Sequence, residues 1–136
     1  MRGIVHHVDL TVRDLAASAP FYETLLGFLG YQRVKKEPRL HVWDLLEGKR
    51  FLGGVALRAA RSPRAHDRYS AGLHHLAFHA ADRADVDRAH ELMKSAGATI
   101  LDAPADYPKY GAGYYAVFVA DPDGLKLEVV HFPERE

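Results

Sequence analysis

The chain has 136 residues, with 18 Lys or Arg and 18 Asp or Glu, so its formal net charge is zero. A neutral chain has no general attraction for nucleic acid or an anionic membrane, and no apolar run is long enough to cross a bilayer. Cysteine is absent, which excludes disulfides, thiolate metal sites and a cysteine nucleophile. The first residues lack the apolar core of a secretory signal, so a cytoplasmic location is expected.

The first half of the chain predicts a strand, a helix and three further strands. Ile4–Val12 alternates apolar and polar residues, which is typical of a half-buried strand. Asp14 stands where a helix N-cap is expected, before the stretch LAASAPFYETLLGFLGY. Pro20 lies inside that stretch and predicts a kink or a late helix start, because an interior proline costs roughly 3 kcal/mol. The following strands are predicted at 31–35, 40–46 and 51–59.

The second half repeats this order. A polar segment without periodicity, 61–72, predicts a linker, and a strand at 73–80 follows it. Asp82 is expected to cap a helix that ends at Gly97. A loop is predicted at 102–113, and DPDG is expected to form a four-residue turn. The remaining strands are predicted at 98–101, 114–120 and 125–132.

The two halves form an internal repeat. A shift of 68 residues, from His7 to His75, also superposes the expected helix caps Asp14 and Asp82. One half cannot readily bury its sheet alone, whereas two stacked copies can. We therefore expect a single α+β domain in which two βαβββ modules form a cupped, barrel-like mixed sheet with the helices outside. The modules are predicted at 4–60 and 73–132, joined by the linker 61–72.

Three side chains are predicted to face the inside of that sheet. His7 and His75 occupy matching places on the first strand of each half and point away from the helices. A four-residue DPDG turn would pair Val117 with Glu128 and place Tyr115 on the face of Glu128. A carboxylate within an apolar strand has to be paired, exposed or bound to a cation. Two imidazoles and this carboxylate predict a facial triad for a divalent metal, with coordination positions open to a ligand.

Three segments carry a family resemblance: HHVDLTVRDLAASAPFYETLLGFLGY, HHLAFHAADRADVDRAHELMKSAGA and YYAVFVADPDGLKLEVV. They resemble the vicinal oxygen chelate superfamily, which contains glyoxalase I, the bleomycin-resistance proteins and the extradiol dioxygenases. The resemblance spans residues 4–132 and implies paired βαβββ modules. It also implies that His7, His75 and Glu128 hold a divalent ion such as Zn, Ni, Mn or Fe(II).

One position departs from part of that family. A resemblance to glyoxalase I or methylmalonyl-CoA epimerase would require Glu or Gln on the last strand of the first half. Aligning the two halves places Leu57, within one residue, opposite Glu128, and neither Ala56, Leu57 nor Arg58 can serve. The remaining triad resembles that of the extradiol dioxygenases and the fosfomycin-modifying thiol transferases. The general base and the reaction therefore stay open.

Five further residues are candidates for contact with substrate: Tyr115, Tyr110, Trp43, Arg58 and His79. Tyr115 would offer a hydroxyl, and Arg58 would hold an anion if it faces inward. Tyr110 belongs to a glycine-hinged loop that can act as a lid or pack on the surface. Trp43 can line a pocket or belong to the core, and His79 can face substrate or solvent.

Two functions stay open from the sequence. The first is a metal-dependent glyoxalase-like enzyme that binds a small molecule through two adjacent oxygens, with lyase, isomerase, dioxygenase or transferase chemistry. The alternative is a bleomycin-resistance-like protein that sequesters an aromatic or cationic drug without metal. Retention of all three ligands favours the enzyme. The site can form within one chain or across a homodimer, with or without exchange of modules.

Overall fold

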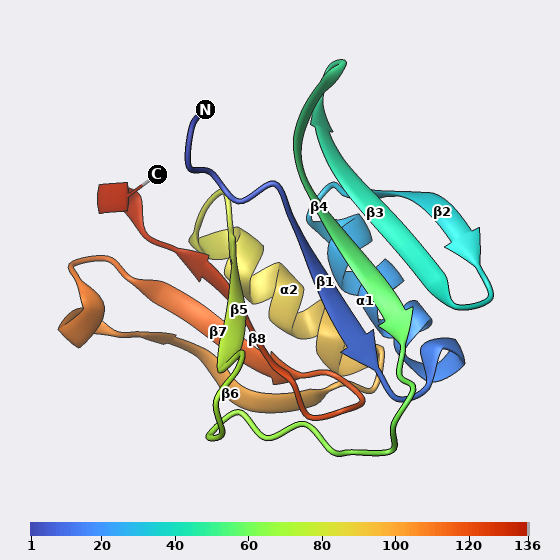
Figure 1. Ribbon diagram of the computed structural model, residues 1–136. Coiled ribbons are helices and arrows are strands. Elements are labelled where there is room, and N and C mark those ends of the chain that lie inside the picture. The colour runs from blue at the N-terminus through green and yellow to red at the C-terminus, as the bar shows by residue number, and fades with distance from the viewer. Residues whose placement is uncertain (136) are drawn as a thin grey trace. The chain divides into compact units, whose positions relative to one another are not determined.

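The computed structural model describes residues 1–135, which form two compact units divided between Arg64 and Ala65. Each unit is a βαβββ module with one four-stranded mixed sheet and one α-helix (Figure 1). The predicted α+β class and the pair of βαβββ modules are thereby confirmed. Within residues 1–135, neither helix has the length and apolar character needed to cross a membrane.

The first unit contains β1 (His7–Val12), α1 (Leu15–Phe28), β2 (Gln32–Glu37), β3 (Leu40–Glu47) and β4 (Arg50–Ala59). The strand order is β1-β4-β3-β2, with β1 parallel to β4 and the other pairs antiparallel. Alternate residues of three strands pack against α1, each fully buried side chain contributing about 1.5–3 kcal/mol. The buried residues on the two sides of this contact are Leu10, Val12, Trp43, Val55, Leu57, Tyr22, Leu25 and Leu26.

Helix α1 begins where its cap predicts and runs through its proline. The Asp14 carboxylate accepts hydrogen bonds from the backbone N–H groups of Ala16 at 3.0 Å and Ala17 at 3.3 Å, which confirms the cap. The helix starts at Leu15 and includes Pro20, so the late-start alternative is wrong. Burial of the helix residues one and two turns beyond the proline outweighs its cost.

The second unit contains one α-helix and two short 3-10 turns besides its strands. Its elements are β5 (His75–His79), α2 (Arg83–Ser95), β6 (Thr99–Asp106), a 3-10 turn η1 (Pro108–Tyr110), β7 (Tyr115–Ala120), β8 (Lys126–His131) and a 3-10 turn η2 (Pro133–Arg135). The strand order is β5-β8-β7-β6, with β5 parallel to β8. The predicted cap Asp82 is confirmed, since its carboxylate accepts from the N–H of Asp85 at 2.7 Å.

Strand β6 is longer than the sequence predicts. The sequence predicts residues 102–106, which include Pro104, as part of a loop, but they pair with β7. Proline is tolerated here because β6 is the edge of the sheet and its register is irregular between Asp102 and Ala105. The loop prediction is therefore wrong for this part of the segment.

The last hairpin differs by one residue from the predicted register. Phe118, rather than Val117, is opposite Glu128. The cause is the side chain of Asp121, which accepts hydrogen bonds from the N–H groups of Asp123 at 2.9 Å and Leu125 at 2.8 Å. Because of these bonds, Leu125, the residue after DPDG, belongs to the turn. The turn is therefore one residue longer than predicted, and strand β8 begins at Lys126.

Candidate functional site

His75 and Glu128 lie on neighbouring strands of the second unit and share one face. The parallel register pairs His75 with Lys126 and Ala77 with Glu128. Because alternate residues of a strand point to the same face, these four residues all point to one side of the sheet. The opposite side carries the apolar residues that pack against α2, such as Leu127.

Glu128 is a buried carboxylate with one strong hydrogen-bonding partner. Its residue is 2% exposed, and the Tyr114 hydroxyl donates to Oε1 at 2.8 Å and Oε2 at 2.9 Å. Burial raises the pKa of Glu128, against the opposing effects of the Tyr114 hydrogen bond and the Lys126 charge. The negative charge is thus incompletely compensated, which is the condition that a bound cation would relieve.

Aromatic rings pack around the ring of Tyr114 on this face. The ring of Tyr110 lies 5.2 Å from that of Tyr114, and Tyr107 lies 5.7 Å from Tyr110 in a stacked arrangement. Tyr107 also contacts Phe118 edge to face at 5.5 Å. Tyr110 is 54% exposed, so the predicted lid residue presents an exposed aromatic ring beside Tyr114.

Tyr115 lies on the other side of the sheet, and its predicted placement beside Glu128 is wrong. The register pairs it with His131. Its hydroxyl donates to Asp87 of α2 at 2.6 Å, and the guanidinium of Arg83 lies 3.8 Å from its ring centroid. The sequence analysis did not predict Tyr114 at this position because it did not take account of the Asp121 side chain, whose hydrogen bonds lengthen the turn by one residue.

The loop that carries Tyr110 depends on a glycine. Gly111 has φ +146°, and a Cβ there would fall well inside van der Waals contact with the Phe132 ring. We expect Gly111→Ala to destabilise the protein by about 1–3 kcal/mol and to displace Tyr110, because strain and overlap act together. Urea unfolding measures the loss. Gly27→Ala is the matched control, since open space surrounds Gly27 in its helix, and equal stability of both variants would contradict the prediction.

His7 occupies the corresponding place in the first unit. It begins β1 and points, like Asp9 and Arg58, away from α1. Arg58 therefore lies on the sheet face of His7, and its Nε donates to Asp9 Oδ2 at 2.6 Å. The carboxylate of Asp9 also lies 3.7 Å from His7 Nε2. Asp9 thus partly neutralises the cation that was expected to meet an anionic substrate.

Both double histidines have the same geometry. The Nδ1 atoms of His6 and His7 lie 2.9 Å apart, and those of His74 and His75 lie 2.8 Å apart. Each pair therefore holds one ring through Nδ1, and Nε2 is the nitrogen placed for another ligand. Burial, with smaller effects of His74 and Lys126, lowers the pKa of His75. This favours the neutral imidazole that binds metals.

The first unit has no carboxylate at the position equivalent to Glu128. Register pairs His7 with Gly54 and His75 with Lys126, so the repeat makes Ala56 the counterpart of Glu128. A methyl group can neither coordinate a metal nor carry a proton. The counterpart of Glu128, which the sequence places at Leu57 within one residue, is therefore Ala56.

The two remaining candidates differ in their surroundings. His79 shares the face of His75, pairs with Val130 and is exposed. Trp43 is fully buried against α1, and its Nε1 donates to Glu23 Oε2 at 2.6 Å. It belongs to the core, the structural alternative that the sequence left open, and it lies on the sheet face opposite His7.

The described residues form no cluster of three His, Asp or Glu side chains that could hold a metal within either unit. His75 and Glu128 belong to the second unit and His7 to the first.

Comparisons with known proteins define the family. The model of the Glyoxalase/Bleomycin resistance protein/Dioxygenase superfamily matches residues 4–129, and the chain belongs to this superfamily. It is 34% identical over 126 residues to protein YqjT of Bacillus subtilis (strain 168), covering 93% of this chain and 97% of YqjT. It is 33% identical over 131 residues to YaeR of Escherichia coli (strain K12), covering 92% and 93%.

Solved structures agree with this assignment. A candidate glyoxalase from Bacillus halodurans is 32% identical, with a TM-score of 0.79 and coverage of 96% of this chain and 97% of that one. Lactoylglutathione lyase from Agrobacterium tumefaciens shares the fold, with a TM-score of 0.69, 22% identity and coverage of 98% and 96%.

Proposed function

We propose that this chain is a metal-dependent enzyme of the superfamily in which His7, His75 and Glu128 hold a divalent ion. The observation that carries the proposal is Glu128, a buried carboxylate whose charge is incompletely compensated, on the face that also presents His75. The paired Nδ1 contacts of the double histidines support it, because they orient the two rings in the same way.

The remaining residues of the site would orient and shield the ligands. Tyr114 keeps its proton, since burial and the neighbouring Glu128 raise its pKa, and it therefore remains a donor that fixes the carboxylate. Tyr110 and Phe118 would hold the apolar part of a substrate and exclude water. A divalent ion bound here would supply Lewis-acid polarisation of a substrate with two adjacent oxygens. Because Ala56 replaces a fourth ligand, we expect lyase, isomerase, dioxygenase or transferase chemistry that needs no acid–base group there.

Metal titration of a ligand variant tests this proposal. We expect His75→Ala to weaken binding of Ni²⁺ or Mn²⁺ by roughly 100-fold or more, since it removes a direct ligand. Isothermal titration calorimetry on metal-stripped protein measures the change. His90→Ala, on the helix of the same unit, is the matched control and should bind within about twofold of wild type. Unchanged affinity in His75→Ala would refute this ligand set, and the stoichiometry per chain would show how many sites form in a homodimer.

The aromatic surface favours a second candidate, sequestration of an aromatic or cationic drug without metal. The rings of Tyr107, Tyr110 and Tyr114 pack together, and Tyr114 bonds the buried carboxylate of Glu128. Such a surface suits a flat cation through stacking and charge. Bleomycin binding by metal-stripped protein, lost in Tyr110→Ala and unaffected by His75→Ala, would establish this function. Binding only in the presence of metal would establish the first.

A further inference from the structure

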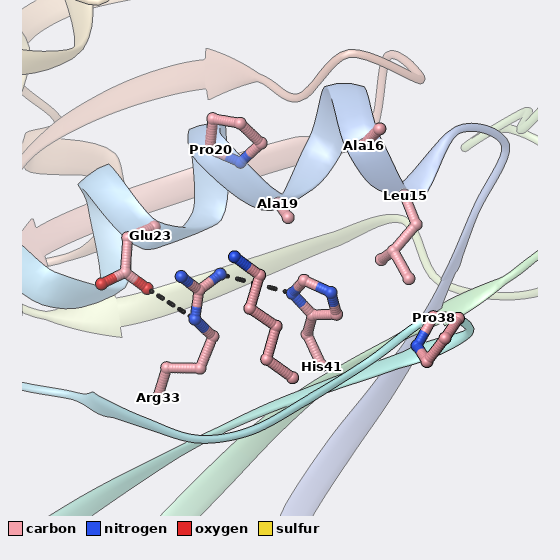
Figure 2. Close-up of a pocket in the computed structure, with 9 residues that line it drawn as sticks. Leu15, Ala16, Ala19, Pro20, Glu23, Arg33, Pro38 and His41 are labelled. Carbon is pink, nitrogen blue, oxygen red and sulfur yellow. Dashed lines mark hydrogen bonds and ion pairs between the residues drawn. The ribbon is translucent and has the colours of Figure 1, made fainter.

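A pocket lies on the helix side of the first unit, between α1 and the β2–β3 hairpin (Figure 2). Its volume is about 540 Å³, and pockets for small organic ligands measure about 300–1,000 Å³. All its lining residues belong to the first unit and lie away from the face of His7. The proposed metal site therefore does not account for it.

One wall of the pocket is a single stripe of the helix. Leu15, Ala16, Ala19 and Pro20 line it, at the spacing that brings helix residues to one side. Figure 2 shows these residues on the helix and Pro38 on the strand side, at the end of the pocket near Leu15. None of these side chains carries a charge or a hydrogen-bond donor, so this wall suits the apolar body of a ligand.

The opposite wall is cationic because of a β-bulge. The register of β2 shifts between Arg33 and Lys35, so that Arg33 pairs with Trp43 and Lys36 pairs with His41. In a regular strand, residues three apart point to opposite faces, whereas the bulge turns Arg33 and Lys36 to the same face. Both then line the pocket together with His41.

The charges on this wall do not cancel. Glu23 is the acidic lining residue; its Oε2 accepts from Trp43 Nε1 at 2.6 Å and lies 3.6 Å from Arg33 Nε. Among residues 1–135, Lys36 has no ion pair with a carboxylate. With His41 neutral, one positive charge remains uncompensated beside an apolar wall.

We propose that this pocket binds a small organic monocarboxylate, with its carboxylate on Lys36 and His41 and its apolar body against α1. His41 is 7% exposed, and its Nδ1 lies 3.3 Å from Arg33 Nη1. Since arginine only donates, Nδ1 accepts and Nε2 carries the proton available to an anion.

Binding should depend on pH through His41. The charged and aromatic groups around His41 come from three elements. They are Arg33 and Lys36 of β2, Glu23 of α1, and Trp43 of β3, the strand of His41 itself. Burial and the charges of Arg33 and Lys36 lower the pKa of His41. A bound carboxylate opposes these effects and raises that pKa, so binding takes up protons. The affinity should therefore increase as the pH falls from 8 to 6, by roughly tenfold at most.

Titration of the intact chain with 4-phenylbutyrate tests the proposal. We expect binding in NMR spectra, with shifts confined to pocket residues. The neutral isostere 4-phenylbutyramide and inorganic phosphate should each bind about tenfold more weakly. The amide lacks the negative charge, and phosphate lacks the apolar body. Equal binding of acid and amide would overturn the carboxylate assignment.

Variants with matched controls locate the site. Ala16→Leu fills the pocket from the exposed helix surface, and Lys36→Gln removes the uncompensated charge. Each should weaken 4-phenylbutyrate binding about tenfold, whereas Ala17→Leu and Lys35→Gln, next to them and outside the pocket, should stay within about twofold. Lys36 and Ala16 are exposed, so folding should persist, and circular dichroism checks it. Unchanged binding in both pocket variants, or no binding by wild type because a second copy fills the pocket, would overturn the proposal.

Discussion

Glu128→Gln should abolish tight metal binding while leaving the metal-free protein equally or more stable. Glutamine has the same shape and still accepts the Tyr114 hydrogen bond, but it lacks the charge whose burial is unfavourable. We expect divalent-metal affinity to fall roughly 100-fold or more, and the free energy of unfolding without metal to rise by about 1 kcal/mol.

The raised pKa of Glu128 determines in which direction the stability of the metal-free protein changes with pH. A folded-state pKa above the ordinary 4.5 means that folded Glu128 holds its proton more tightly than in the unfolded chain. Its contribution to stability is therefore lost as the pH rises from 4.5 through the folded pKa. Glu128→Gln should remove that loss. Glu91→Gln, at an exposed position of α2, is the control, and lower stability of Glu128→Gln at neutral pH would contradict the account.

Trp43→Ala should cost the first unit about 3–5 kcal/mol, the largest stability effect that we expect. The ring is fully buried between the sheet and α1, and its Nε1 bonds Glu23. Truncation leaves a cavity and removes a hydrogen bond from a carboxylate that also pairs with Arg33. Urea denaturation followed by circular dichroism measures the loss, because Trp43 is the chain's one tryptophan and fluorescence would vanish with it.

Two further variants help to interpret the stability loss of Trp43→Ala: one keeps an aromatic ring at position 43, and the other is a control at an exposed site. Trp43→Phe keeps an aromatic ring and should lose about 1–2 kcal/mol, mainly through the missing hydrogen bond. Tyr69→Ala, at a residue that is 80% exposed, should change stability by less than about 0.5 kcal/mol. A Trp43→Ala protein as stable as Tyr69→Ala would show that the contact between α1 and the sheet does not hold the first unit together.

The sequence predicts the modules well because their signals are local. Asp14 and Asp82 bond backbone groups two or three residues away, and strand alternation places His7 and His75 directly. Whether His7 meets the other two ligands depends on contacts between the modules, which no local pattern specifies.

The errors that concern the faces of the sheets have one kind of cause: one residue added to or dropped from a strand. The carboxylate of Asp121 draws Leu125 into the turn, so Tyr114 rather than Tyr115 meets Glu128. A bulge after Arg33 likewise produces the cationic pocket wall, which simple alternation does not predict. In the last hairpin, the side chain that bonds to nearby backbone, Asp121, decides which residues share the face of Glu128.

Anomalous diffraction from crystals grown with Mn²⁺ tests the central claim most directly. We expect one manganese per chain, bonded to Nε2 of His7, Nε2 of His75 and a carboxylate oxygen of Glu128, with the Tyr114 hydroxyl still bonded to that carboxylate. His7 can come from the same chain or from a partner in a homodimer. Manganese bound elsewhere, or Glu128 buried beside Tyr114 with no ion in the fully loaded protein, would contradict it.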